Sequence, residues 1–330
     1  MSRIHFKAPA RLGYQYQIRP LSTQLGKLTS HPTSIRPSKT EIQQTRLSAQ
    51  NMEVAVRSLH RDGLVVVENV IPHEALDSLN SKMVEDAYHL YSRKGDSPFN
   101  YNPGNIQQDA PPVKEHFDPR IFLNPIATQI TSAALGPRPK WTFCSGNSAM
   151  PPTAENPPMS QPVHSDADFA HPDHPFALVI NVPLITMTPE NGSTEVWLGT
   201  HTDSGLHVQE GAHGERASGR INLDELEKRR VERPPCQPIV PKGSLVIRDL
   251  RLWHAGIGNQ TQVPRIMLAM IHFASWYRNP MKLELTDDLK SLIEGQNDLE
   301  VPVDWVSESD ALSNYLNRGF GNAYDFNQSP

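Results

Sequence analysis

A histidine and an aspartate two residues apart, His164 and Asp166, are the side chains whose types and spacing best fit metal chemistry. A strand sends alternate side chains to the same face, so both can reach one ion. One imidazole and one carboxylate are two of the three ligands of the facial triad that binds iron(II) and leaves positions open for substrates. Such a pair also occurs by chance in many proteins, so it does not establish a metal site alone.

The third ligand must come from a distant part of the chain, and His254 is the candidate. It follows a turn at residues 241–243 and an apolar run at 244–247. Because the chain has 14 histidines, an ordinary core or surface histidine is the alternative. Arg265 stands eleven residues later and opens another apolar run. A guanidinium there can bind a carboxylate through two parallel, charge-assisted hydrogen bonds, whereas the alternative is a solvated cation at a strand edge.

Short strands are the elements expected to position these residues. Beyond Lys140, apolar runs are separated by Pro, Gly, Asn and Asp, which is typical of a β-sandwich or barrel. The expected strands cover residues 141–144, 177–182, 193–197, 244–247 and 266–271.

Helices are expected mainly before these strands. One ends at Gly63 and is followed by an apolar strand at 64–67; another begins after Pro72, and a third covers 123–135. A polar insertion at 205–233 contains a further helix near 223–230. Helices first and strands afterwards predict an α+β protein with a mainly β core, a barrel flanked by helices.

The length of 330 residues allows one large domain. Residues 1–50 contain eight Lys or Arg and one acid, Glu41, without a periodic apolar stripe. We therefore expect a poorly ordered N-terminal arm at 1–50 and a single domain at 51–330. Within this domain, the helical part spans 51–139, the β core 140–278 and a C-terminal extension 279–330.

Composition narrows the class of protein and its surroundings. A net charge of -5 gives no reason to expect a nucleic acid or a membrane surface as partner, and no apolar run is long enough to span a bilayer. Two distant cysteines, Cys144 and Cys236, fit a reducing compartment, so a cytoplasmic location is expected. The basic N-terminus keeps a mitochondrial location open, and a peroxisomal one is a further alternative.

Four segments in a fixed order carry a family resemblance. They are Asp62-Gly63 with the strand that follows; His164-Ser165-Asp166; Asn191 to Gly199-Thr200-His201, with Thr200 in place of a serine; and Trp253-His254 through Asn259 to Arg265. Together they resemble the phytanoyl-CoA dioxygenase-like (PhyH) branch of the iron(II)/2-oxoglutarate oxygenases. The resemblance covers about two thirds of the chain, from residue 62 to about 273.

The resemblance implies a double-stranded β-helix, also called a jelly-roll or cupin-like barrel. It implies that Fe(II), 2-oxoglutarate and O2 are used, with release of succinate and CO2. His164, Asp166 and His254 would be the catalytic iron ligands, and Arg265 would bind 2-oxoglutarate. Gln161 and Thr194 are further candidates for contact with this co-substrate, against ordinary turn and strand roles. Asp166 argues against a halogenase, because iron halogenases of this fold carry a small residue there.

The expected substrate is a small-molecule metabolite that is hydroxylated or desaturated, with secondary metabolism as the setting; a homodimer is an open alternative to a monomer. Two rival functions also stay open. A 2-oxoglutarate-independent non-haem iron oxygenase would keep the triad without needing Arg265. A non-catalytic cupin-like binding protein would share only the fold.

Overall fold

A seven-stranded mixed sheet forms the centre of the molecule. The computed structural model describes residues 29–211, 219–317 and 325–326. The strands lie in the order β1-β2-β9-β5-β11-β4-β3, and every neighbouring pair is antiparallel except β1 with β2. Their bounds are Thr33–Ile35 (β1), Leu64–Val67 (β2), Asn105–Gln108 (β3), Lys140–Ala149 (β4), Ala177–Pro183 (β5), Leu245–Asp249 (β9) and Arg265–Phe273 (β11). This arrangement confirms the expected α+β architecture with a mainly β core.

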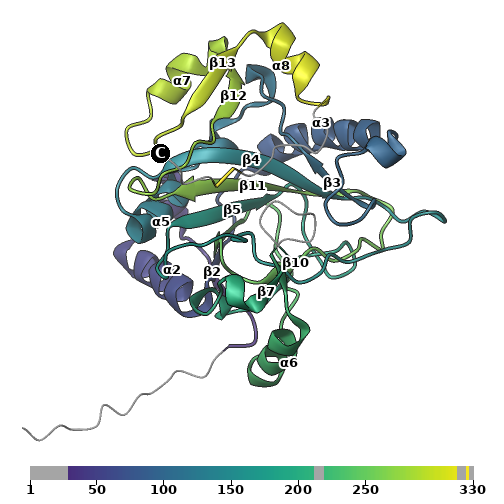
Figure 1. Ribbon diagram of the computed structural model, residues 1–330. Helices are drawn as coiled ribbons and strands as arrows, with labels where there is room; N and C mark the ends of the chain where they lie inside the picture. Colours follow the sequence, from purple (N-terminus) through teal and green to yellow (C-terminus); the bar gives the residue numbers. More distant parts are fainter. Residues whose placement is uncertain (1–28, 212–218, 318–324, 327–330) are drawn as a thin grey trace, which may run out of the picture.

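A smaller layer of short strands lies against one face of this sheet (Figure 1). It contains β6 (Glu195–Val196) paired with β10 (His254–Ala255), and β7 (Gln209–Glu210) paired with β8 (Arg220–Ile221). Isolated bridges extend the layer, among them His164 to His254 and Met187 to Val240. The strand expected at 193–197 is thus only two residues long, because its ends turn into loops.

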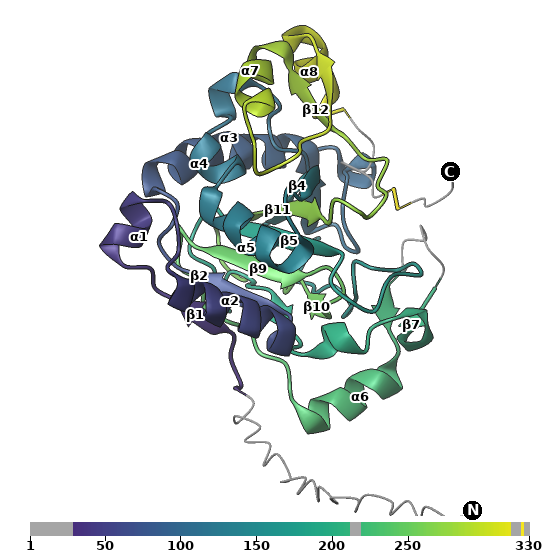
Figure 2. The ribbon, with the colours of Figure 1, turned by 90° about the vertical axis from the view of Figure 1, so that its left-hand side faces the viewer.

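Helices cover the opposite face of the large sheet. The helix α2 (Ala49–Asp62) packs on β2 and α5 (Pro125–Leu135) on β5, and the two lie side by side in Figure 2. The helix α3 (His73–Tyr91) packs beside β3 and β11. Gly63 ends α2 with φ 73°, a left-handed conformation that glycine adopts without steric cost. The three expected helices of this region are therefore present.

The folded part begins before residue 51, which corrects the expected arm. Residues 1–28 lie outside the described part, but β1 pairs with β2, and α1 (Lys39–Gln43) starts with a capping box formed by Ser38 and Glu41. Ile35 and Leu47 are buried in the main core. These elements are too short to give a periodic apolar pattern, so composition alone suggested disorder.

The remaining elements lie outside the two sheets. The insertion contains α6 (Leu223–Glu232), and α4 (Pro119–Phe122) precedes α5. The C-terminal extension forms a parallel pair, β12 (Leu283–Thr286) with β13 (Val303–Val306), and the helices α7 (Lys290–Glu294) and α8 (Glu308–Asn314). Short 3-10 turns occur at Lys94–Asp96, Lys114–His116, Thr200–Thr202, Leu206–Val208 and Asp287–Leu289.

Aromatic side chains attach the extension to the rest of the protein. The Tyr315 hydroxyl donates to Asp86 on α3 at 3.2 Å, and Phe326 stacks on Phe169 with ring centroids 4.2 Å apart. None of the helices described is both long and apolar enough to cross a membrane.

Candidate active site

The two histidines of the predicted triad face each other across a backbone bridge. His164 and His254 exchange two hydrogen bonds, each 2.9 Å from N to O, so their side chains leave the backbone as a directly opposed pair. Their ring centroids are 4.4 Å apart. Residues around His164 form this bridge rather than the regular strand expected from the sequence, so pairing with β10 sets the position of the ring.

Backbone carbonyls orient both imidazole rings. His164 Nδ1 lies 2.9 Å from the carbonyl oxygen of Pro162, and His254 Nδ1 lies 2.9 Å from that of Leu252. Each Nδ1 therefore carries the proton and donates it, which leaves the Nε2 lone pair for a metal. Burial lowers the pKa of both histidines, against the opposing effect of Asp166, so both rings are neutral near pH 7.

Asp166 completes the triad with one oxygen. Its Oδ1 lies 3.8 Å from His164 Nε2 and 3.7 Å from His254 Nε2, while Oδ2 accepts a hydrogen bond from Arg248 Nη2 at 2.5 Å. Burial alone would raise the pKa of Asp166, but Arg248 and the two histidines lower it well below its usual range. The ligand atoms all lie within 4.8 Å of one another. Two neutral imidazoles and one carboxylate fit the facial set that binds iron(II).

Arg265 is buried beside the cavity rather than solvated. It is 1% exposed, and its side chain leaves the start of β11 on the same face as Met267 and Ala269, which line the cavity. Nη2 donates to the carbonyl of Gly192 at 2.8 Å, and Nη1 donates to Asn147 Oδ1 at 3.2 Å. Nε has no partner, and the guanidinium has no ion pair, among the residues described. Burial lowers the pKa of Arg265 to about 10.

One cavity between the two layers contains the triad, and Arg265 contacts its lining residue Asn147. The triad lines it together with polar and apolar side chains from both sheets. Gln161 and Thr194, both expected near the co-substrate, line it, as does Asn147. Gln161 Oε1 accepts from the backbone N of Gly256 at 2.8 Å, and its buried Nε2 has no partner among the described residues. Gln161 thus has a structural bond and a spare donor.

Sequence reasoning missed two residues of the site. Arg248 lies next to Asp166, and the only local signal for it is a charged residue that follows three apolar residues in a buried strand. The Tyr101 ring lies 4.9 Å from the His164 ring and has a left-handed φ of 67°. That backbone conformation is uncommon for a residue other than glycine and concentrates at functional sites. No motif marks Tyr101, because the contact depends on a loop more than 60 residues away from His164.

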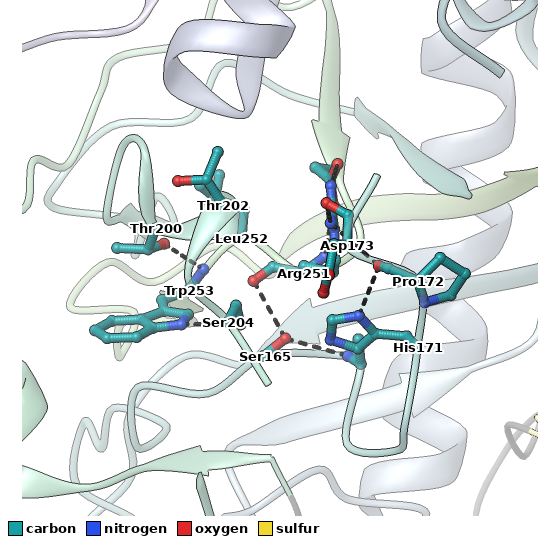
Figure 3. A network of polar contacts seen from close by, with 12 residues as sticks. Ser165, His171, Pro172, Asp173, Thr200, Thr202, Ser204, Arg251, Leu252 and Trp253 are labelled. Atoms are coloured by element: carbon teal, nitrogen blue, oxygen red, sulfur yellow. Dashed lines mark hydrogen bonds and ion pairs between the residues drawn. The ribbon is translucent and has the colours of Figure 1, made fainter. Parts of the chain in front are cut away.

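A hydrogen-bond network connects the segments that carry the ligands (Figure 3). Ser165 Oγ donates to the carbonyl of Arg251 at 3.3 Å. The backbone N of Trp253, next to His254, donates to Thr200 Oγ1 at 3.0 Å, and the Trp253 indole donates to Ser204 at 3.0 Å. The network joins the residue after His164 to the residues just before His254, and it thereby helps to fix the positions of both ligands.

Two further histidines, His171 and His174, lie outside the site, as do Met150 and Trp276. His171 and His174 form no metal group with other described residues, and the His171 ring lies against the carbonyl of Pro172. Met150 belongs to the main core, and Trp276 is 54% exposed. The triad is the one cluster of three or more potential metal ligands within the described ranges.

The fold and the site together define a jelly-roll metalloprotein with a His-Asp-His triad. The family model for phytanoyl-CoA dioxygenase (PhyH) matches residues 59–267, and the chain belongs to this family. It is an iron(II)- and 2-oxoglutarate-dependent dioxygenase, which confirms the expected class of enzyme and its cofactors, Fe(II), 2-oxoglutarate and O2.

Two solved proteins, SnoN and EctD, are similar to this chain at low identity. The 2-oxoglutarate-dependent epimerase SnoN from nogalamycin biosynthesis is 16% identical, with a TM-score of 0.50 over 69% of this chain and 82% of SnoN. A second SnoN structure contains Fe3+, alpha ketoglutarate and nogalamycin RO, and the match covers 85% of that chain. EctD from S. alaskensis, with 2-oxoglutarate and 5-hydroxyectoine, is 19% identical, with a TM-score of 0.47 over 69% of this chain and 76% of EctD. The SnoN match shows the expected jelly-roll fold.

Proposed function

We propose that His164, Asp166 and His254 hold the iron, that Arg265 binds the distal carboxylate of 2-oxoglutarate, and that the enzyme oxidises a small organic molecule in the same cavity. Arg265 is the observation that carries this proposal. A guanidinium buried to 1% exposure without a carboxylate partner among the described residues is costly, and an anionic ligand would offset that cost.

Different side chains are proposed to bind the iron and the 2-oxoglutarate. The neutral histidines offer Nε2, and the ionised Asp166 offers Oδ1, because Arg248 holds the other oxygen. Arg265 donates from Nη1 to Asn147, which lines the cavity, and its buried Nε has no partner among the described residues. Bound iron and 2-oxoglutarate supply the oxidising power, with 2-oxoglutarate decarboxylated to succinate and CO2.

Two further residues extend the proposed co-substrate site. Gln161 has a spare amide donor, and Thr194 lies on the cavity wall two residues after Gly192, whose carbonyl accepts from Arg265. We assign both to contact with 2-oxoglutarate.

The proposed enzyme is a single domain, because one hydrophobic cluster includes residues from Ile35 to Phe326. The two free cysteines, Cys144 and Cys236, support a reducing compartment, with the cytoplasm as the proposed location.

Succinate release tests the proposal. Purified protein with Fe(II), 2-oxoglutarate and O2 is expected to form succinate even without an added substrate, through slow uncoupled turnover. His254→Ala is expected to abolish this activity, whereas His174→Ala, at an exposed histidine outside the site, is expected to keep it. Equal succinate formation by wild type and His254→Ala would contradict the assignment. Oxygen consumption without succinate would favour the 2-oxoglutarate-independent oxygenase.

A further inference from the structure

Arg248 lies in the cavity wall beside an apolar patch. On β9, Leu245 and Ile247 point into the main core, whereas Val246 and Arg248 point the other way and line the cavity. Val246 packs in an apolar cluster with Leu64 and Val66 of the neighbouring strand. An aliphatic residue at position 248 would continue this cluster, but it would leave the buried carboxylate of Asp166 without its cation. The 6% exposed guanidinium is therefore explained by polar contacts rather than by apolar packing.

Two of the three nitrogens of Arg248 have partners in the protein. Nη2 donates to Asp166 Oδ2 at 2.5 Å, and Nε donates to Asn181 Oδ1 at 3.2 Å. Nη1 is buried and has no partner among the described residues. Buried donors in folded proteins are almost always satisfied, so an acceptor from the occupant of the cavity is expected here.

The charges of the site also require an anion. Asp166 and Arg248 are the ionised side chains that line the cavity, and Arg265 lies directly behind it. The two negative charges of 2-oxoglutarate balance Fe(II), and Asp166 balances one arginine, which leaves one positive charge. Two groups outside the lining, Asp168 and Arg220, carry opposite charges and do not change this balance. One buried positive charge is unfavourable, and a substrate with a single negative charge would remove it.

One part of the lining fits a hydrophobic body, whereas Asn100, Gln107 and Ser145 belong to a polar part of the same cavity. Next to Arg248, aliphatic side chains from both sheets form a continuous surface. They are Leu64, Val66, Met187, Val196, Val240, Val246 and Met267. A ligand that satisfies both features has one acidic group and a mainly apolar skeleton.

We propose that Arg248 binds the carboxylate of the organic substrate and that the enzyme acts on small hydrophobic acids. This assignment rests on the proposed function, since it places the substrate beside the iron ligand Asp166. The same guanidinium could instead take a carboxylate of 2-oxoglutarate, so the experiment separates these two sources of a carboxylate.

Binding of matched acid and amide probes tests the assignment. Wild-type protein with Fe(II) and 2-oxoglutarate is first shown, without oxygen, to form the visible charge-transfer band of the chelate. Cinnamate, 3-phenylpropionate and octanoate are then compared with their primary amides by calorimetry. The acids are expected to bind about 10- to 100-fold more tightly, as for one charge-assisted hydrogen bond. Equal affinity, or no binding of any acid at millimolar concentration, would overturn the proposal.

Two variants test whether Arg248 is responsible for the preference for acids over amides. Arg248→Gln is expected to reduce the preference for acids to about twofold or less, and Arg248→Lys to retain part of it, because lysine keeps the charge but not the planar fork. An acid preference that persists in Arg248→Gln would overturn the proposal. A fall in 2-oxoglutarate affinity with unchanged acid preference would assign Arg248 to the co-substrate instead. If the wild-type band never forms, the proposed function fails as well; if it forms without acid preference, only this inference fails.

Discussion

Replacing Arg265 is expected to weaken 2-oxoglutarate binding without affecting the metal. The guanidinium is 1% exposed and makes no ion pair among the described residues, so its charge is available to the co-substrate. It contacts Gly192 and Asn147 rather than any of the three metal ligands. Arg265→Met therefore removes the carboxylate contact while leaving the triad in place.

The expected magnitude follows from two charge-assisted hydrogen bonds to one carboxylate. Each contributes about 1.5–3 kcal/mol, so the loss is about 3–4 kcal/mol after the remaining contacts are allowed for. At about 1.4 kcal/mol per factor of ten, 2-oxoglutarate is expected to bind two to three orders of magnitude more weakly. The 2-oxoglutarate affinity of Arg265→Lys is expected to lie between those of Arg265→Met and the wild type, because lysine keeps the charge but not the bidentate geometry.

Calorimetry on the Mn(II)-loaded protein measures this effect without turnover. A matched control is Arg251→Lys, since Arg251 is also a buried arginine but already pairs with Asp249 at 2.8 Å. The control is expected to bind 2-oxoglutarate as the wild type does. Mn(II) affinity is expected to be unchanged in all these variants. An affinity of Arg265→Met for 2-oxoglutarate within about threefold of the wild type would refute the reasoning.

Three further predictions concern the metal, the pH dependence and the N-terminal elements. His254→Ala removes one of the three proposed ligands and is expected to weaken iron binding by more than about 100-fold; stoichiometric iron after dialysis would contradict this. Burial lowers the pKa of His272 to about 3. Below pH ~6.5 this histidine is therefore protonated in the unfolded chain but not in the folded protein, so the free energy of unfolding falls as the pH falls. Between pH 6.5 and 5 the free energy of unfolding of the wild type should fall by about 2 kcal/mol more than that of His272→Gln. Urea denaturation at several pH values measures this, and the same pH dependence in both proteins would exclude this role of His272. Glu41 accepts bonds from the backbone N of Ser38 and Ser48, both 2.7 Å, so Glu41→Ala is expected to cost about 2 kcal/mol; no change would show that α1 is not anchored there.

The sequence was sufficient for the elements whose signals are local. Alternating or continuous apolar runs indicated β2, β5, β9 and β11, and Gly63 marked the end of α2. The three proposed iron ligands could be selected because they stand beside such runs, and the structure brings the ligand atoms of His164, Asp166 and His254 within 4.8 Å of one another. The order of the four family segments indicated the enzyme family, which the spacing of the candidate ligands alone does not indicate.

Long-range pairing accounts for what sequence reasoning missed. The partner of Arg248 is Asp166, 82 positions away in the chain, and no local sequence pattern predicts this contact. The fold of residues 33–43 depends on β1 pairing with β2, since a three-residue strand has no periodicity of its own. Likewise His164 is placed by its bridge to His254, not by a strand of its own.

The most direct test of the central claim is the visible spectrum of the protein after anaerobic addition of Fe(II) and 2-oxoglutarate. The account predicts a weak charge-transfer band of chelated 2-oxoglutarate in the wild type. The band is expected to be absent in His254→Ala and weakened in Arg265→Met. A wild-type protein that binds iron but shows no band at saturating 2-oxoglutarate would contradict the assignment of this site.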